Sequence, residues 1–336
     1  MKKLSLIHKL FFFINSIFAT ALLLSYILPF LSPKTLPAFA VFSLFAPVLI
    51  VLNLLFFTFW LIKLKKQFFL SALILGIGWL FTSPFYKFSE KKILLNDDVK
   101  VMSYNVRMFN YYKWSDDKTI AKKIIDFIVD KNPDILAIQE FYDSDKITFA
   151  YPYKYIKTNS KSNKFGLAIY SRFKIINSGS LNFKNSANNA IFIDIIKEKD
   201  TIRVYNIHLE SLKINPRKEN FGEKSSEKLF KRLEKSFQKQ ATQTEQFIAH
   251  NKEWKGKEII LGDFNNTAYS WIYKQLCSDK KDAFIEAGKG FGKSFKYPFP
   301  VRIDFILTDK SIDINQYKTF NVKYSDHFPI LARINW

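Results

Sequence analysis

Residues 258–267 read EIILGDFNNT, a run of apolar residues that ends at Leu261 and is followed by Asp263 and Asn265. A short apolar run bounded by turn-forming residues is typical of a buried strand. On its own, the GDFNN segment would be an ordinary turn rich in Asp and Asn. The same arrangement, a short strand with a polar residue at its end, occurs in other segments of the chain, so these polar residues need a common explanation.

Further strand-like and helical segments lie on both sides of this stretch. Apolar runs predict strands at 99–106, 134–139, 167–171, 190–196, 201–209, 258–261, 303–307 and 329–334. Apolar residues at helical spacing predict helices at 119–131, ended by Asn132-Pro133, and from about 230 to 247. Many strands with few long helices predict an α/β (α+β) domain in which two packed sheets are flanked by helices.

The polar residues at the ends of these runs are carboxylates, amides and imidazoles. They are Asn105, Glu140, His208, Asp263, Asn265, Asp304, Asp326 and His327. Hard oxygen ligands of this kind suit Mg²⁺, Mn²⁺ or Ca²⁺ better than a soft metal. Amide and imidazole N–H groups can hold the oxygens of a phosphate ester, and a neutral histidine can activate water.

Each of these residues, taken alone, also has a purely structural explanation. Asn105 could lie in a turn, Glu140 could point into solvent at a strand end, and His208 would more often be a hydrogen-bonded core histidine. The set is more informative than its members, because chance would rarely assemble all six motifs in one chain. Two of the chain's four histidines belong to the set, whereas His8 and His250 have no such context.

The motifs SYNVR, IQEF, NIHLES, LGDFNNT, RIDFIL and SDHFPI, in this order, resemble the endonuclease/exonuclease/phosphatase superfamily. That superfamily includes pancreatic-type deoxyribonucleases, abasic-site endonucleases, neutral sphingomyelinases and inositol polyphosphate 5-phosphatases. The resemblance covers residues 99–336. It implies a four-layer α-β-β-α sandwich of two mixed sheets. It also implies a Mg²⁺-dependent hydrolase of phosphate esters, with Mn²⁺ or Ca²⁺ as the other possible cations.

The resemblance also implies which residues would bind the metal ion. Glu140 would be its principal ligand, and Asn105 would lie beside it. Asp326 would complete or support the site. Asn105 is expected to contact the substrate as well as the cation.

The remaining motif residues would carry the proton transfer and hold the phosphate. His327 would be the general base that takes a proton from the attacking water, with Asp304 orienting it and stabilising its charged form. Asp263 would position the water or support the leaving group. Asn265 and His208 would hydrogen-bond the phosphoryl oxygens, and His208 would offset the charge that builds up during the reaction.

Departures from the superfamily's branches narrow the substrate. His208 stands where abasic-site endonucleases carry a tyrosine, and Phe141-Tyr142 follows Glu140 where those enzymes have Thr-Lys. The order Arg302-Ile303-Asp304 differs from the Asp-Arg order of the 5-phosphatases and disfavours that branch. A phosphodiesterase or endonuclease-type enzyme is the favoured prediction. A sphingomyelinase-like lipid phosphodiesterase is the alternative, and a non-enzymatic binding module is less favoured because no catalytic position is missing.

The first 90 residues have a different composition, poor in acids and rich in Phe and Leu. Apolar segments at about 10–31, 36–62 and 68–86 each reach the roughly 20 residues that a membrane-spanning helix needs. They predict a membrane region at 1–90 with three transmembrane helices, followed by a catalytic domain at 97–336. A signal peptide fits poorly, because the first run is too long and no small-residue cleavage site follows it. Buried core helices would show a polar face, which these segments lack.

The placement of lysines predicts how the chain crosses the membrane. The first helix is preceded by Lys2, Lys3 and Lys9. The second gap holds Lys63, Lys65 and Lys66, whereas the first gap holds only Lys34. The positive-inside rule puts both groups in the cytoplasm. Three crossings then leave an integral protein of the cell (inner) membrane with its catalytic domain on the extracytoplasmic side. Lys87, Lys91 and Lys92 oppose this orientation, but long translocated domains largely ignore such charges.

The formal net charge of +21 includes a dense run of Lys and Arg between residues 213 and 239. Such a run could bind nucleic acid or an anionic lipid surface. The favoured explanation is the solvated face of a helix whose apolar face carries Phe230, Leu233 and Phe237, because glutamates are interleaved. The expected partners are a phosphodiester substrate, from nucleic acid or a lipid head group, and the bilayer, without an obligate protein partner. The single cysteine, Cys277, excludes an internal disulfide and a cysteine metal cluster.

Overall fold

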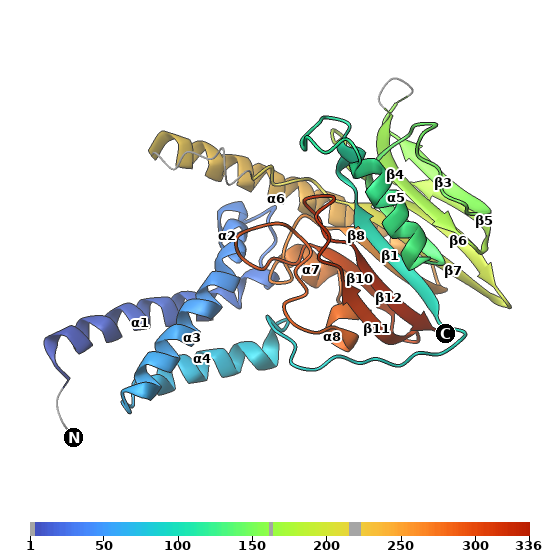
Figure 1. Cartoon of the computed structure of the whole chain (residues 1–336). Coiled ribbons are helices and arrows are strands. Elements are labelled where there is room, and N and C mark those ends of the chain that lie inside the picture. Colours follow the sequence, from blue (N-terminus) through green and yellow to red (C-terminus); the bar gives the residue numbers. More distant parts are fainter. Residues whose placement is uncertain (1–3, 161–163, 215–222) are drawn as a thin grey trace.

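A computed structural model of the chain describes residues 4–160, 164–214 and 223–336 (Figure 1). Lys2, Lys3 and residues 215–222 of the predicted basic run lie outside the described residues. Within the described part, the chain forms a group of apolar helices at its N-terminal end and a larger α/β domain that begins at Val99.

The strands of the α/β domain form two six-stranded sheets. The first sheet has the order β11 (Asp313–Thr319), β12 (Ile330–Asn335), β1 (Val99–Asn105), β2 (Ile135–Tyr142), β4 (Phe165–Ser171), β3 (Tyr153–Thr158). The second has the order β5 (Lys174–Ser180), β6 (Asn189–Lys197), β7 (Asp200–His208), β8 (Lys257–Asp263), β10 (Asp304–Asp309), β9 (Lys280–Asp282). β1 and β2 are parallel, as are β7 and β8, and their other neighbours are antiparallel, so both sheets are mixed.

Three hydrophobic clusters build this domain in layers. The cluster between the sheets joins side chains such as Val101 and Ala137 of the first sheet to Val204 and Leu261 of the second. Helix α5 (Ile120–Lys131) buries Ile120, Ile124 and Ile128 on the outer face of the first sheet. Helices α6 (Glu223–Asn251) and α7 (Trp271–Leu276) cover the second sheet, and the short helix α8 (Ala283–Ala287) packs at the edge of the central cluster. The predicted four-layer α-β-β-α sandwich is confirmed.

The N-terminal helices are α1 (Leu6–Ser25), α2 (Pro37–Phe42), α3 (Ala46–Ile62) and α4 (Phe68–Phe81), with 3-10 turns at Leu28–Phe30 and Ser43–Phe45. Among the described residues, two stretches are long and apolar enough to cross a membrane, Leu6–Phe30 with 25 residues and Pro37–Ile62 with 26. The prediction of three such helices was wrong in its count, because α4 has only 14 residues. Thr82 already has extended backbone, and Pro84 disfavours helix at the residue before it.

α1, α3 and α4 pack together around polar side chains. Asn15 Nδ2 donates to Ser71 Oγ at 2.9 Å, and Trp60 Nε1 donates to Asn15 Oδ1 at 3.0 Å. Asn53 Nδ2 donates to the Phe18 carbonyl at 3.0 Å. Asn15, Asn53, Ser71 and Trp60 are all fully buried. The polar groups of these helices therefore face one another, which fixes their relative positions.

One end of this helical group rests on the α/β domain (Figure 1). α2 packs against α6, where Phe42 and Phe230 have ring centroids 6.1 Å apart. Lys34, which precedes α2, has its Nζ 2.8 Å from Oε2 of Glu245 on α6. Beyond α4, Ser83 Oγ accepts a hydrogen bond from Arg302 Nη2 at 3.1 Å. The start of α1 and the α3–α4 turn lie at the opposite end, away from the α/β domain.

Candidate active site

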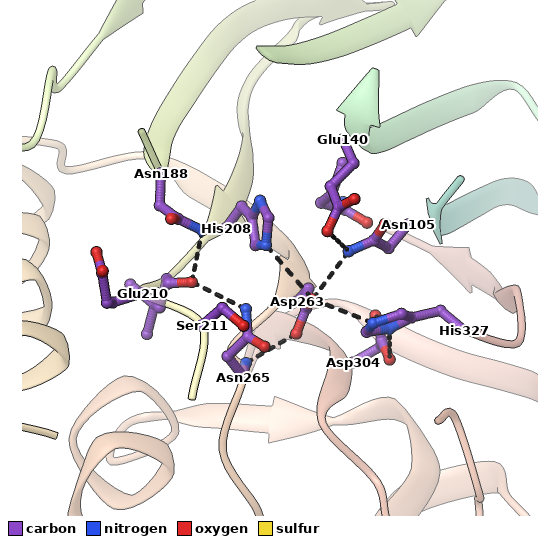
Figure 2. A network of polar contacts seen from close by, with 12 residues as sticks. Asn105, Glu140, Asn188, His208, Glu210, Ser211, Asp263, Asn265, Asp304 and His327 are labelled. Carbon is purple, nitrogen blue, oxygen red and sulfur yellow. Dashed lines mark hydrogen bonds and ion pairs between the residues drawn. The ribbon is translucent and has the colours of Figure 1, made fainter. Parts of the chain in front are cut away.

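The strand ends that carry the predicted polar residues meet at one edge of the sandwich (Figure 2). In the second sheet, the register places His208 opposite Asp263 and Asp304 opposite Asp263. In the first sheet, Asn105 ends β1 beside β2, which carries Glu140. Because parallel neighbours end at the same edge, and because the two sheets pack face to face, both sets of side chains point into one shared space.

Unusual backbone conformations mark three positions in this space. Gly262 has a φ of 150°, and a Cβ there would lie 1.9 Å from the Ile207 carbonyl oxygen, so only glycine allows β8 to approach β7 this closely. Glu140 and Asn265 have φ values of 49° and 50°, in the left-handed region. At Glu140 the register with β4 shifts, as at a β-bulge. Left-handed non-glycine residues cost free energy and tend to gather at functional sites.

Asn105 links the two sheets through its side-chain amide. Its Nδ2 donates to Asp263 Oδ2 at 3.0 Å and to Glu140 Oε1 at 3.3 Å. Its Oδ1 accepts from the backbone N–H of Arg107 at 3.1 Å, and Arg107 Nη1 lies 3.2 Å from Asp326 Oδ2. Burial and the negative charge of Asp326 raise the pKa of Glu140. The charge of Asp326 therefore disfavours the charged form of Glu140, which a bound cation would relieve.

Asp304, His327 and Asp263 form a buried chain of contacts. His327 Nδ1 lies 3.0 Å from Asp304 Oδ2 and can donate to it, and His327 Nε2 lies 3.6 Å from Asp263 Oδ2. Burial alone would lower the pKa of His327, but the carboxylates of Asp304 and Asp263 raise it to about 10. Burial and the charge of Asp304 raise the pKa of Asp263. The protonated ring would thus act as a cation between two acids.

His208 faces the same carboxylate from the other side. Its Nε2 lies 3.6 Å from Asp263 Oδ2, which is too long for a hydrogen bond, and this buried atom has no hydrogen-bond partner among the described residues. Burial and the positive charge of His327 lower the pKa of His208 to about 3, so its ring is neutral. A buried ring nitrogen without a partner costs about 1–3 kcal/mol, and a phosphoryl oxygen could provide the missing contact.

Asn265 is held by its surroundings on three sides. Its backbone N–H donates to Asp263 Oδ1 at 2.8 Å, and its Nδ2 donates to the Leu209 carbonyl at 2.9 Å. Gln240 Nε2 donates to the Asn265 carbonyl at 3.1 Å. Within the described residues the second Nδ2 hydrogen meets no acceptor, so it is available to a ligand.

Sequence reasoning missed a second ring of residues that supports these loops. Gln240 Nε2 also donates to the Glu210 carbonyl at 2.7 Å, and Gln243 Oε1 accepts from the Glu210 N–H at 2.8 Å. Asn188 Nδ2 donates to the Leu209 carbonyl at 2.8 Å. Glu210 stands inside the motif NIHLES next to Ser211 and could have been noticed there. The two glutamines lie on α6 and Asn188 precedes β6, so no local motif identifies them.

Two groups in the site have the donor atoms that a metal ion needs. Glu140, Asp326 and Asn105 supply carboxylate and amide oxygens, the ligands that hard divalent cations prefer. Asp263, Asp304 and His327 offer ligand atoms that all lie within 4.8 Å of one another. Both groups are rich in carboxylate oxygens, so the space between them fits a divalent cation.

All eight predicted site residues are brought into this space or to its rim; they are Asn105, Glu140, His208, Asp263, Asn265, Asp304, Asp326 and His327. Their separate chemical roles stay predictions.

Family models match both parts of the chain. The model of the Endonuclease/Exonuclease/phosphatase family matches residues 102–327, which confirms the resemblance carried by the six motifs. A model described as a domain of unknown function (DUF8431) matches residues 8–85. No curated protein sequence matches the chain significantly.

Several solved structures are similar to the α/β domain. An endonuclease/exonuclease/phosphatase family protein from Leptotrichia buccalis has 20% identity and a TM-score of 0.50, covering 71% of this chain and 100% of its own. The human Nocturnin catalytic domain with bound sulfate has 16% identity and a TM-score of 0.52, covering 74% and 96%. D. rerio TDP2 complexed with single-strand DNA product has 16% identity and a TM-score of 0.54, covering 72% and 100%. At these identities the likeness supports the fold alone.

Proposed function

The chain belongs to the endonuclease/exonuclease/phosphatase family of hydrolases, and we propose that it is a metal-dependent phosphodiesterase of the nuclease type, held at a membrane by its N-terminal helices. The observation that carries the proposal is the Asp304–His327–Asp263 chain of contacts, with Glu140 and the unpartnered Nε2 of His208 around one space. Similar structures include one of TDP2 with a single-strand DNA product, which agrees with a nucleic-acid substrate.

The side chains around the site would hold a phosphate group. The neutral His208 ring and the free Nδ2 hydrogen of Asn265 would donate hydrogen bonds to its oxygens. Glu140, Asn105 and Asp326 would hold the divalent cation. When bound, Mg²⁺ would offset charge on the phosphate oxygens, and as a nearby positive charge it would favour the neutral form of His327.

Neutral His327 would take the proton of the attacking water at Nε2, the nitrogen that faces Asp263. Asp304 would hold the ring through Nδ1 and stabilise the imidazolium that forms. Asp263 would position the water. The displacement is in line and forms no covalent intermediate with the enzyme.

A lipid phosphodiester is the second candidate substrate. Arg302, which binds Ser83 just beyond α4, stands two residues before Asp304. Pro47 and Phe85 line a small cavity together with Tyr269, four residues beyond Asn265. These contacts put catalytic segments close to the ends of the apolar helices, where a lipid head group would lie.

The proposed activity can be tested with the full chain in detergent micelles. The panel would contain single- and double-stranded DNA, RNA, a phosphocholine lipid and a nucleoside 5′-monophosphate, each with Mg²⁺ and with a chelator. We expect hydrolysis of nucleic-acid phosphodiesters that a chelator removes and Mg²⁺ restores. Turnover of the monoester alone, or turnover that a chelator leaves unchanged, would contradict the proposal.

We propose the domain organisation and membrane orientation on separate grounds. The outer faces of α1, α3 and α4 expose large apolar side chains, such as Phe13 (63%), Leu55 (60%) and Leu73 (62%). Exposed apolar surface of this extent needs a lipid or protein environment. Residues 1–90 would form the membrane region and 97–336 the catalytic domain.

The orientation gives a separate prediction. Lysines gather at the α3–α4 turn, at the end of the helices away from the catalytic domain, so we expect that end in the cytoplasm of the cell membrane and the catalytic domain outside. Fusions of alkaline phosphatase and of a fluorescent protein that matures only in the cytoplasm would be made to the C-terminus. We expect phosphatase activity without fluorescence. Fluorescence without phosphatase activity would reverse the proposed orientation.

A further inference from the structure

The segment that follows Asn105 has an unusual backbone. Arg107, Met108, Phe109 and Asn110 have φ values of 45°, 53°, 52° and 67°, so four successive non-glycine residues are left-handed. L-residues visit this region as single residues, and a run of four needs support from the surroundings. Such conformations persist where the structure enforces them, often beside functional sites.

This segment is fixed to the active site at its start and to the core in its middle. The Arg107 N–H donates to Asn105 Oδ1 at 3.1 Å, and its guanidinium lies 3.2 Å from Asp326 Oδ2. Phe109 is buried against Phe141, the neighbour of Glu140, with ring centroids 5.8 Å apart. The segment therefore presents the residues that follow it at a defined place next to the site.

The residues presented are aromatic and exposed. Tyr111 is 51% exposed and Tyr112 is 64% exposed. The Tyr111 ring lies 4.2 Å from the ring of Tyr142, and the Tyr112 ring lies 5.4 Å from that of Phe165. Tyr142 and Phe165 are cross-strand partners on β2 and β4, with ring centroids 5.2 Å apart. We call these four side chains the aromatic platform.

The platform lies beside the proposed metal site, since Tyr142 is two residues beyond Glu140 on β2. Among the described residues, the buried clusters include neither Tyr111 nor Tyr112, so core packing does not require their rings. Exposed tyrosine rings bind flat π-systems by stacking, and nucleobases in a single strand have free faces for it. The exposed Lys113 beside them suits a polyanion better than an acyl chain.

We propose that Tyr111 and Tyr112 form a stacking subsite for an unpaired base of a single-stranded nucleic acid whose scissile phosphodiester lies between Glu140 and His327. This inference rests on the proposed function and specifies its substrate. Tyr142 and Phe165 would hold the two exposed rings in place through the ring contacts described above. The subsite would set affinity for the strand and leave the reacting groups unchanged.

The test compares Tyr111→Ala/Tyr112→Ala with Tyr111→Phe/Tyr112→Phe in the full chain in micelles. Removing an aromatic ring that stacks on one base typically weakens binding about tenfold or more. For a single-stranded oligonucleotide we expect the alanine variant to raise KM about tenfold with kcat nearly unchanged. The phenylalanine variant keeps both rings and should behave like the natural chain. Tyr153→Ala, at a 36% exposed tyrosine at the start of β3, is the matched control.

Two further measurements separate this inference from the proposed function. For an oligomer of the same length that lacks bases, the natural chain and the alanine variant should have equal kcat/KM. Binding of a labelled oligonucleotide, followed by fluorescence anisotropy, should weaken about tenfold in the alanine variant without any need for turnover. Unchanged KM and unchanged binding in that variant would overturn the subsite, even if phosphodiesters are hydrolysed. Absence of phosphodiester hydrolysis by the natural chain would instead remove the proposed function.

Discussion

Glu140→Gln should lower turnover by about a thousandfold or more at limiting Mg²⁺, which corresponds to losing several kcal/mol of transition-state stabilisation. The substitution keeps the length of the side chain and its acceptor oxygen for Asn105 Nδ2, now at 3.3 Å. It removes one of the two carboxylates that we propose as ligands of a hard cation, the other being Asp326. Loss of this charge should weaken such a site, because a hard cation is typically held by few carboxylates together with bound waters.

The same change should leave the fold intact. Burial and the charge of Asp326 raise the pKa of Glu140, so its negative charge is unfavourable in the metal-free chain and its removal should not destabilise it. Thermal denaturation without metal would check this. Glu198→Gln is a matched control, because Glu198 is also left-handed, with a φ of 57°, but lies in the exposed β6–β7 connection. If Glu140→Gln turns over as fast as the natural chain at limiting Mg²⁺, Glu140 is not a metal ligand.

The central strands could be predicted from sequence because they are buried on both faces. β2 and β8 contain the unbroken apolar runs Ile135–Ile138 and Ile259–Leu261, and a run of this kind reads as a strand without further information. The edge strands lack that signal. β5, with the sequence KIINSGS, is mostly exposed, and β11, DINQYKT, is half polar, so neither was predicted. The limit of α4 was also misjudged, since apolar composition continues beyond the point where Thr82 and Pro84 end the helix.

The candidate site could be predicted to a similar degree, and for a related reason. The six motifs at strand ends, taken together with the superfamily that they resemble, were enough to gather Asn105, His208 and Asp263. The supporting contacts of Gln240 come from a helix whose position over the loops depends on tertiary packing. His327 has a second carboxylate neighbour, Asp263. This contact depends on the register that pairs Asp304 with Asp263, and no spacing in the sequence reveals that register.

That second carboxylate sharpens the expectation for the general base. His327→Ala should lose at least about a thousandfold in turnover, because proton transfer and positioning of the water are removed together. It also leaves Asp304 and Asp263 buried without the ring between them, which would destabilise the fold by about 3–5 kcal/mol. Turnover must therefore be measured well below the melting temperature of the variant. His250→Ala, which removes a part-buried ring hydrogen-bonded to Tyr205 at 3.1 Å, is the control for losing a histidine elsewhere.

Asp304→Asn should also be severe, because it removes the charge that stabilises the imidazolium while keeping a side chain of nearly the same shape beside Nδ1. We propose that Asp304 acts through the ring it holds, so its loss should matter little once the ring is gone. The double variant His327→Ala/Asp304→Asn should then be about as slow as His327→Ala alone. The measurement is single-turnover hydrolysis of the same substrate by all four chains. If the loss in the double variant equals the product of the two single losses, Asp304 and His327 act independently, and their assignment as one catalytic unit is wrong.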